Sequence, residues 1–320
     1  MSSSVTARGT KVKYLANAKE LDFCQVANIA TWKRWRYENR LTPTSSLLSG
    51  FFGHGYKSYN QSIISKIQDN PDTEPEEVDI KQTTKPDFLS LALTHGRKNE
   101  VNARNSYLKY LQKHPDNQHI KRIDFCSAGE ISSKMEIEFD EAKSHIIITP
   151  DLVLEIDSNP RIVEFKCPYF SILKKKDKTV TLVAVEFHSD NPYGKESSFV
   201  QAAVYALVRN CYRFTTCYYF TDGGSEEIVV IYNYRMSTEL SHEIFAGISA
   251  VEKDLKAYET SLITGEKLKY RSLSTKKRMM TDMMNTHFID SVIYFPNGNK
   301  TMDLNTSTHS EDELDEYSPN

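Results

Sequence analysis

The stretch HIIITPDLVLEIDSNPRIVEFKCPYF, residues 145–170, decides the fold of this 320-residue chain. Residues 146–148 and 152–156 are apolar runs of strand length, and Asp-Ser-Asn-Pro at 157–160 has the composition of a turn. The segment is therefore predicted to fold as a hairpin of buried strands that brings charged side chains to one place.

The second strand of this hairpin carries two charged side chains on one face. Side chains alternate between faces along a strand, so Glu164 and Lys166 point one way and Val163 and Phe165 the other. Burying a carboxylate without a partner costs free energy, and a divalent cation would offset that cost. Asp151 and Glu164 supply the hard oxygen ligands that Mg²⁺ or Mn²⁺ prefers, with the backbone carbonyl of Phe165 in reach as a third ligand.

Lys166 would stand beside such a metal. An ammonium group in that position can orient a water molecule or help to deprotonate it, and it can stabilise negative charge that develops on a phosphate. The chemistry implied is the hydrolysis of a phosphodiester assisted by one or two Mg²⁺ or Mn²⁺ ions.

The spacing of these residues resembles a known nuclease signature. Pro150-Asp151, followed after twelve residues by Glu164-Phe165-Lys166, resembles the PD-(D/E)xK motif. The longer string TPDLVLEIDSNPRIVEFKCPY resembles its version in the lambda-exonuclease or YqaJ-type viral recombinase family, which includes viral alkaline exonucleases. The resemblance implies an α/β fold with a restriction-endonuclease-like core, in which helices flank a mixed central β-sheet, and an N-terminal helical extension.

Glu100 lies on the apolar stripe of a helix predicted at residues 88–114. The pattern Gly-x-x-x-Glu-x-x-Ala around it resembles the family helix that contributes a further acidic residue, so Glu100 is expected to complete the metal site. The alternative is a partly exposed carboxylate at the edge of the helix, paired with Arg97 or Arg104.

Another helix, predicted at residues 197–212, places Gln201 and Tyr205 four residues apart on one face. Gln201 resembles the glutamine of a family motif, whose amide positions the DNA or the carboxylates of the site. Tyr205 is expected to contact nucleic acid beside it. The alternative is a hydrogen bond between these two side chains within the core.

Residues 16–37 have helical spacing and become basic and aromatic at residues 32–36. The sequence WKRWRYENRLTPTS resembles the family segment that binds the terminal 5′-phosphate of DNA. Carried onto this chain, the phosphate contacts would be Arg36 or Arg40 together with Ser45, because guanidinium groups and hydroxyl donors bind a phosphate dianion well. A helix with a solvated basic face is the alternative.

Three other segments are predicted from local pattern. Residues 180–187 are predicted as a strand, and residues 215–220 and 227–234 as a hairpin around Asp-Gly-Gly. Ser237 is predicted to cap the helix that follows.

The composition fits a globular protein, with 39% hydrophobic and 26% charged residues. The formal net charge is −3, but residues 301–320 hold six acidic and no basic residues. Residues 1–300 therefore hold 40 basic and 37 acidic residues, a mildly basic body. Five cysteines without a Cys-x-x-Cys pair predict reduced thiols and count against zinc and iron–sulfur sites.

The sequence predicts five consecutive regions. They are an N-terminal helical, DNA-binding region at 1–69, an acidic loop at 70–87, a nuclease core at 88–265, a C-terminal extension at 266–300 and a disordered acidic tail at 301–320. No apolar run has the length of a membrane span, and no signal peptide is evident. The chain is expected to be intracellular, in the nucleus or cytoplasm of the host cell if it is viral.

Together, the motifs predict a Mg²⁺-dependent deoxyribonuclease, most specifically a 5′-to-3′ exonuclease in recombination, replication or repair. The expected partners are double-stranded DNA with 5′-phosphorylated ends and, as the family implies, a single-strand annealing protein. The alternatives are a structure-specific or restriction-type endonuclease, which could also cleave RNA, and a catalytically silent nucleic-acid-binding protein. The sequence leaves the oligomeric state open.

Overall fold

The computed structural model describes most of the chain. The described residues are 16–55, 58–71, 88–169, 179–189, 195–224, 226–265, 274–298 and 301–302. The predicted acidic loop beyond residue 71 and the predicted acidic tail beyond residue 302 lie outside them. No helix in this described part combines the length and the hydrophobicity that a membrane span needs.

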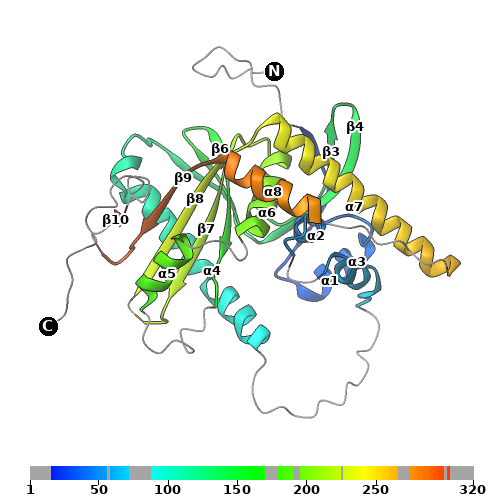
Figure 1. Cartoon of the computed structure of the whole chain (residues 1–320), viewed down its shortest axis with the longest axis horizontal. Helices are drawn as coiled ribbons and strands as arrows, with labels where there is room; N and C mark the ends of the chain where they lie inside the picture. The colour runs from blue at the N-terminus through cyan, green and yellow to red at the C-terminus, as the bar shows by residue number, and fades with distance from the viewer. Residues whose placement is uncertain are drawn as a thin grey trace, which may run out of the picture.

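A seven-stranded sheet forms the centre of the molecule, with helices on both sides (Figure 1). Its order is β10-β9-β8-β7-β6-β5-β2, and only the β6–β7 pair is parallel. The strands are β2 (Ile123–Ser127), β5 (Leu152–Ile156), β6 (Asn159–Lys166), β7 (Arg213–Thr221), β8 (Glu227–Arg235), β9 (Phe288–Tyr294) and β10 (Thr301–Met302). The predicted α/β fold with a mixed central sheet is confirmed.

The predicted hairpin is formed by β5 and β6, which pair antiparallel through a two-residue turn. Asp157 and Ser158 have φ angles of 49° and 67°, as the tightest turns between twisted strands require. The Asp157 carboxylate also accepts hydrogen bonds from the backbone N–H groups of Lys121 and Arg122, at 3.0 and 2.9 Å. These bonds anchor the turn beside the edge strand β2.

The two faces of β6 are buried by different helices. Helix α6 (Lys195–Val208) packs on the face that carries Ile162 and Glu164, and helix α4 (Phe88–Lys113) packs on the other face. Phe165 meets the ring of Tyr107 from α4 edge-on, with ring centroids 5.9 Å apart. The predicted alternation of β6 and the predicted helix at 88–114 are confirmed.

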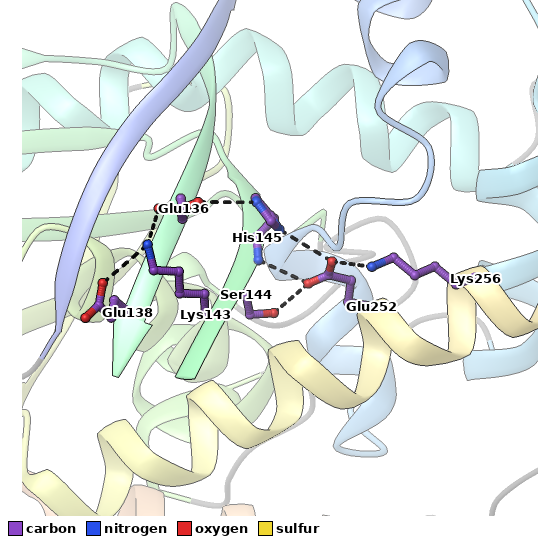
Figure 2. Close-up of polar contacts among 7 residues, drawn as sticks. All are labelled: Glu136, Glu138, Lys143, Ser144, His145, Glu252 and Lys256. Atoms are coloured by element: carbon purple, nitrogen blue, oxygen red, sulfur yellow. Dashed lines mark hydrogen bonds and ion pairs between the residues drawn. The ribbon is translucent and has the colours of Figure 1, made fainter. Parts of the chain in front are cut away.

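A second, three-stranded sheet has the order β1-β3-β4 and is antiparallel throughout. Its strands are β1 (Asn17–Gln25), β3 (Ile131–Phe139) and β4 (Ala142–Ile148). Helix α7 (Thr238–Thr264) runs past β4 and past the N-terminal helices (Figure 1). In Figure 2, Glu252 of α7 accepts hydrogen bonds from the Ser144 hydroxyl at 2.7 Å and the His145 backbone N–H at 3.1 Å.

The N-terminal region contains three short helices and a strand. The helices are α1 (Ile29–Glu38), α2 (Ser45–Phe51) and α3 (Tyr59–Gln68). The prediction of one helical segment over residues 16–37 is therefore wrong for residues 17–25, which form β1. Pairing with β3 satisfies the backbone of this segment and outweighs its weak helical spacing.

Trp32 and Trp35 fasten α1 to the small sheet. The Trp32 indole N–H donates to the Ser132 hydroxyl at 3.0 Å, and the Trp35 indole N–H donates to the Asp22 carboxylate. Both indoles are thus engaged within the protein, so the aromatic part of the basic segment serves packing.

Residues 180–187 were predicted as a strand but belong to helix α5 (Val180–Ser189). A short apolar run has no periodicity that separates a buried strand from a buried helix. Here the run packs on the sheet, where Phe187 contacts the rings of Tyr218 and Phe220.

The remaining local predictions agree with the structure. The predicted strands at 215–220 and 227–234 lie within the antiparallel pair β7 and β8. The hydroxyl of Ser237 accepts a hydrogen bond from the Leu240 backbone N–H at 3.1 Å and so caps α7. Helix α8 (Ser274–His287) then leads into β9, so the central sheet extends past residue 265.

Candidate active site

The candidate site lies at the end of β6, on the face that α6 covers. Glu164 is 1% exposed, and its Oε1 accepts a hydrogen bond from Lys166 Nζ at 2.5 Å. Lys166 Nζ also donates to Oε1 of Gln201 on α6 at 3.3 Å. The structure therefore brings together the three residues that the sequence assigned to the catalytic end of the hairpin and to the following helix.

Asp151 joins this group just before β5. Its Oδ2 accepts a hydrogen bond from the backbone N–H of Phe165 at 2.8 Å, which turns the carboxyl group toward the end of β6. Burial, followed by the negative charge of Glu164, raises the pKa of Asp151 well above its ordinary value. The negative charges of the two carboxylates repel each other, and a cation between them would offset this repulsion.

Lys166 stays charged in this environment. Burial alone would lower its pKa, but the carboxylates of Glu164 and Asp151 outweigh burial and raise the pKa of Lys166 above its ordinary value. These carboxylates favour the charged form of Lys166, in which the ammonium group donates hydrogen bonds. Its chemistry is the orientation of a water molecule and the stabilisation of negative charge on a phosphate.

The acidic pair fits a hard divalent cation. Oε2 of Glu164 is buried and has no hydrogen-bond partner within the described part of the chain. Among the described residues, no three His, Cys, Asp or Glu side chains are placed so that together they could hold a metal ion. Mg²⁺ commonly uses one or two protein carboxylates and completes its shell with water and substrate phosphate. Asp151 and Glu164 would hold it, and the Phe165 carbonyl remains a predicted third ligand.

Glu100 of α4 lies close to Asp151. Partial burial, followed by the negative charge of Asp151, raises the pKa of Glu100. A Cβ atom at Gly129, whose φ is +53°, would lie 3.3 Å from Glu100 Oε1 and 4.0 Å from the Asp151 carbonyl oxygen. Gly129 therefore leaves room for Glu100 beside the acidic pair. Its part in metal binding stays a prediction.

The oxygen and the nitrogen of the Gln201 side-chain amide both form hydrogen bonds. Its oxygen accepts from Lys166, and its nitrogen donates to the Ser197 hydroxyl one turn earlier at 3.2 Å. Tyr205 does not bond to Gln201, which removes the alternative of a Gln–Tyr pair. The buried Tyr205 hydroxyl instead makes a 2.8 Å hydrogen bond with Ser45 of α2.

Three of the residues predicted to bind phosphate or nucleic acid have partners within the protein. Arg40 forms a 2.6 Å ion pair with Glu259 of α7 and lies over the ring of Tyr37. Ser45 is 6% exposed and its hydroxyl is used by Tyr205. The Tyr205 hydroxyl is in turn used by Ser45, and the contact of Arg40, Ser45 and Tyr205 with a phosphate or with nucleic acid stays a prediction.

A pocket of about 330 Å³ next to the site contains Arg36 instead. We call it the basic pocket, because two cations and several hydroxyl groups line it. Its lining residues include Arg36, Ser46, Ser62, Ser65, Lys66, Asp69, Ser197 and Gln201. The Arg36 guanidinium lies 4.8 Å from the ring centroid of Trp32, and burial lowers its pKa.

Lys66, Ser46 and Ser62 line this pocket, and the sequence did not single them out. The available signal was the position of Lys66 on α3, three residues after Ile63 and beside Ile67, both of which are buried. A lysine next to an apolar stripe is often a solvated edge residue, because its long stem reaches water. The pattern alone therefore does not single out Lys66.

The solved structures that are similar to this chain include two of LHK-Exo. The alkaline exonuclease LHK-Exo from Laribacter hongkongensis has 15% identity and a TM-score of 0.45, with 72% of this chain and 96% of that chain covered. LHK-Exo in complex with dAMP has 14% identity and a TM-score of 0.43, with 71% and 95% covered. No family model and no curated protein matches the sequence.

Proposed function

We propose that this protein is a Mg²⁺-dependent deoxyribonuclease, and specifically a 5′-to-3′ exonuclease that acts on phosphorylated ends of duplex DNA. One observation carries the proposal. The Gln201 side chain bonds to Lys166 at the acidic pair and also lines the basic pocket. The residues that hydrolyse the phosphodiester and the pocket that binds a phosphate would therefore be adjacent, with Gln201 common to both.

The chain's own residues supply positioning and charge. Mg²⁺ bound by Asp151 and Glu164 would polarise a phosphoryl oxygen and lower the pKa of a bound water. Lys166 donates a hydrogen bond to the water or to the phosphate and stabilises the charge that develops there. Gln201 fixes the ammonium group of Lys166 in place, so little reorganisation is needed at the moment of reaction.

The basic pocket explains why the enzyme would act at an end. A terminal phosphate bound beside Gln201 places the next phosphodiester of the same strand toward Lys166. Hydrolysis there releases one nucleotide and leaves a new terminal phosphate for the next cycle. Resection in this direction leaves a 3′ overhang, which a single-strand annealing protein could take up in recombination or repair.

The test is cleavage of linear duplex DNA that carries a 5′-phosphate at one end only. Each strand is labelled in turn, and the reaction contains either Mg²⁺ or EDTA. We expect Mg²⁺-dependent loss of nucleotides from the phosphorylated 5′ end by the wild-type protein and none by Lys166→Ala. The exposed Lys253 of α7 offers a matched control, Lys253→Ala, which should cleave as the wild type does.

Two other results would replace the proposal. Internal cuts that ignore the phosphorylated end would make the protein an endonuclease. Tight DNA binding without cleavage in any divalent metal would make it a catalytically silent binding protein.

A further inference from the structure

The segment that carries Asp151 connects the two sheets. Residues 149–151 lie between β4 of the three-stranded sheet and β5 of the central sheet. In so short a connection the position of each residue depends on how its neighbours are fixed, because the backbone has only two soft torsions per residue. The position of the Asp151 carboxylate therefore depends on the contacts that hold this connection.

The second and third residues of the connection are bonded to backbone N–H groups. The Pro150 carbonyl accepts a hydrogen bond from the Gly129 N–H at 2.9 Å. The Asp151 carboxylate accepts one from the Phe165 N–H at 2.8 Å. These bonds attach the connection to the loop before β3 and to the end of β6.

The first residue, Thr149, is held through its side chain. Its hydroxyl makes a 2.6 Å hydrogen bond with the hydroxyl of Ser132 on β3. The pairing of β3 with β4 ends at Ser133 and Ile148, so Ser132 and Thr149 are the next opposed positions. Their bond thus continues the pairing of the two strands through side chains, at the point where β4 leaves the sheet.

Ser132 is itself fixed by a helix. It is 1% exposed, and its hydroxyl accepts a hydrogen bond from the Trp32 indole N–H of α1 at 3.0 Å. An indole N–H can only donate, so the hydroxyl hydrogen of Ser132 remains available for Thr149. A chain of hydrogen bonds therefore runs from α1 through β3 to the residue two positions before Asp151.

We propose that Ser132 and Thr149 are positioning residues, whose hydrogen bond places the Asp151 carboxylate for metal binding. Pro150 transmits the restraint, since its ring fixes φ and limits the residue before it to extended backbone. Outer partners that orient a metal ligand are worth about tenfold or more in metal affinity. The metal at Asp151 and Glu164 belongs to the proposed function, on which this inference rests, but its binding can be measured without cleavage.

The experiment titrates Mn²⁺ into the protein without DNA and measures the dissociation constant by isothermal titration calorimetry. Thr149→Val removes the hydroxyl and nearly keeps the shape of the side chain, and it should weaken Mn²⁺ binding about tenfold. Thr149→Ser keeps the hydroxyl and should bind Mn²⁺ as the wild type does. Ser132→Ala should weaken binding by a similar factor, and the double variant with Thr149→Val should be about as weak as Ser132→Ala alone, because both changes remove the same hydrogen bond.

Ser144→Ala is the matched control, because the Ser144 hydroxyl is also buried in the three-stranded sheet and donates to Glu252 at 2.7 Å. It should lose stability as Ser132→Ala does, with unchanged affinity for Mn²⁺. Equal losses of affinity in Ser144→Ala and Ser132→Ala would show a merely structural role and overturn the proposal. A Thr149→Val protein that binds Mn²⁺ as tightly as the wild type would overturn it as well.

Cleavage of linear duplex DNA separates this inference from the proposed function. If the protein is a nuclease, Thr149→Val should need about tenfold more Mg²⁺ for half-maximal cleavage and should reach the wild-type rate at saturating Mg²⁺. Mn²⁺ binding that depends on the Thr149 hydroxyl, without cleavage of DNA in any metal, would sustain the inference and end the nuclease proposal. Cleavage by variants whose metal affinity is unchanged would do the reverse.

Discussion

Oε2 of Glu164 is the atom that bears most directly on metal binding. The other oxygen of Glu164 accepts a hydrogen bond from Lys166 at 2.5 Å. The carboxylate of Asp151 also interacts electrostatically with the same ammonium group. Two carboxylates and one ammonium leave a formal negative charge in a buried place. A divalent cation would neutralise it, since hard oxygen ligands and excess negative charge are what Mg²⁺ requires.

Glu164→Gln should therefore remove metal binding and preserve the shape of the side chain. Mg²⁺ at ten times its dissociation constant should raise the free energy of unfolding of the wild-type protein by about 1.4 kcal/mol. The variant should show no such increase when thermal unfolding is compared in Mg²⁺ and EDTA. Glu155→Gln, at an exposed position of β5, is the control, and a Glu164→Gln protein that still responds to Mg²⁺ would refute the assignment.

Helix α6 joins the parts of the site through one of its faces. Ser197, Gln201 and Tyr205 follow each other at intervals of four residues, so they lie on the same side of the helix. Ser197 accepts from Gln201, Gln201 accepts from Lys166, and Tyr205 bonds to Ser45 of α2. The same face therefore supports the ammonium group of β6 and fastens the N-terminal helices beside it.

Ser45→Ala and Tyr205→Phe should each destabilise the protein by about 1–2 kcal/mol, because each leaves the hydroxyl of the other residue buried without a hydrogen-bond partner. The double variant should lose less than the sum, since no unsatisfied hydroxyl remains. Chemical denaturation measures these values, with Thr275→Ala, at an exposed position of α8, as the control. The DNA affinity of Ser45→Ala and Tyr205→Phe should be unchanged. A variant that loses affinity without losing stability would instead support the direct contact with DNA that the sequence predicts.

In the whole molecule, α7 packs against β4 of the small sheet, against the N-terminal helices α2 and α3, and against α6. Glu252 of α7 accepts hydrogen bonds from Ser144 and His145 of β4 and pairs with Lys256 at 2.8 Å (Figure 2). Burial alone would raise the pKa of Glu252, but these hydrogen bonds outweigh burial and place the pKa below its ordinary value. The attachment of β4 to α7 therefore depends on the charged form of Glu252.

A carboxylate with a depressed pKa stabilises the folded state above its unfolded pKa and loses that effect as the pH falls through its folded pKa. Glu252→Gln should thus be less stable than the wild type at neutral pH, by about 1–2 kcal/mol. The difference should shrink as the pH falls below the ordinary pKa of a glutamate, and it should disappear once the pH is also below the lowered folded-state pKa of Glu252, where the residue is protonated in both states. Urea unfolding across this pH range tests this, with Glu243→Gln on the same helix as the control. A difference that persists in acid would contradict the role of the charge.

The sequence by itself determined the parts of the fold that depend on local period and turn chemistry. Alternation placed Glu164 and Lys166 on one face of β6, and the turn at Asp157 and Ser158 paired β5 with β6. Helical spacing identified α4, and Ser237 marked the beginning of α7. These features follow from the strand and helix periods, which neighbouring residues define without help from distant ones.

Only the tertiary structure decided which distant side chains meet. Arg40 pairs with Glu259 and Ser45 with Tyr205, and no local pattern encodes either contact. In the same way, packing of separate helices placed Lys66 in the pocket that Arg36 lines. Pairing with β3 made residues 17–25 a strand, and packing on a completed sheet made residues 180–189 a helix. In each case the free energy comes from burial and hydrogen bonding between elements far apart in the chain.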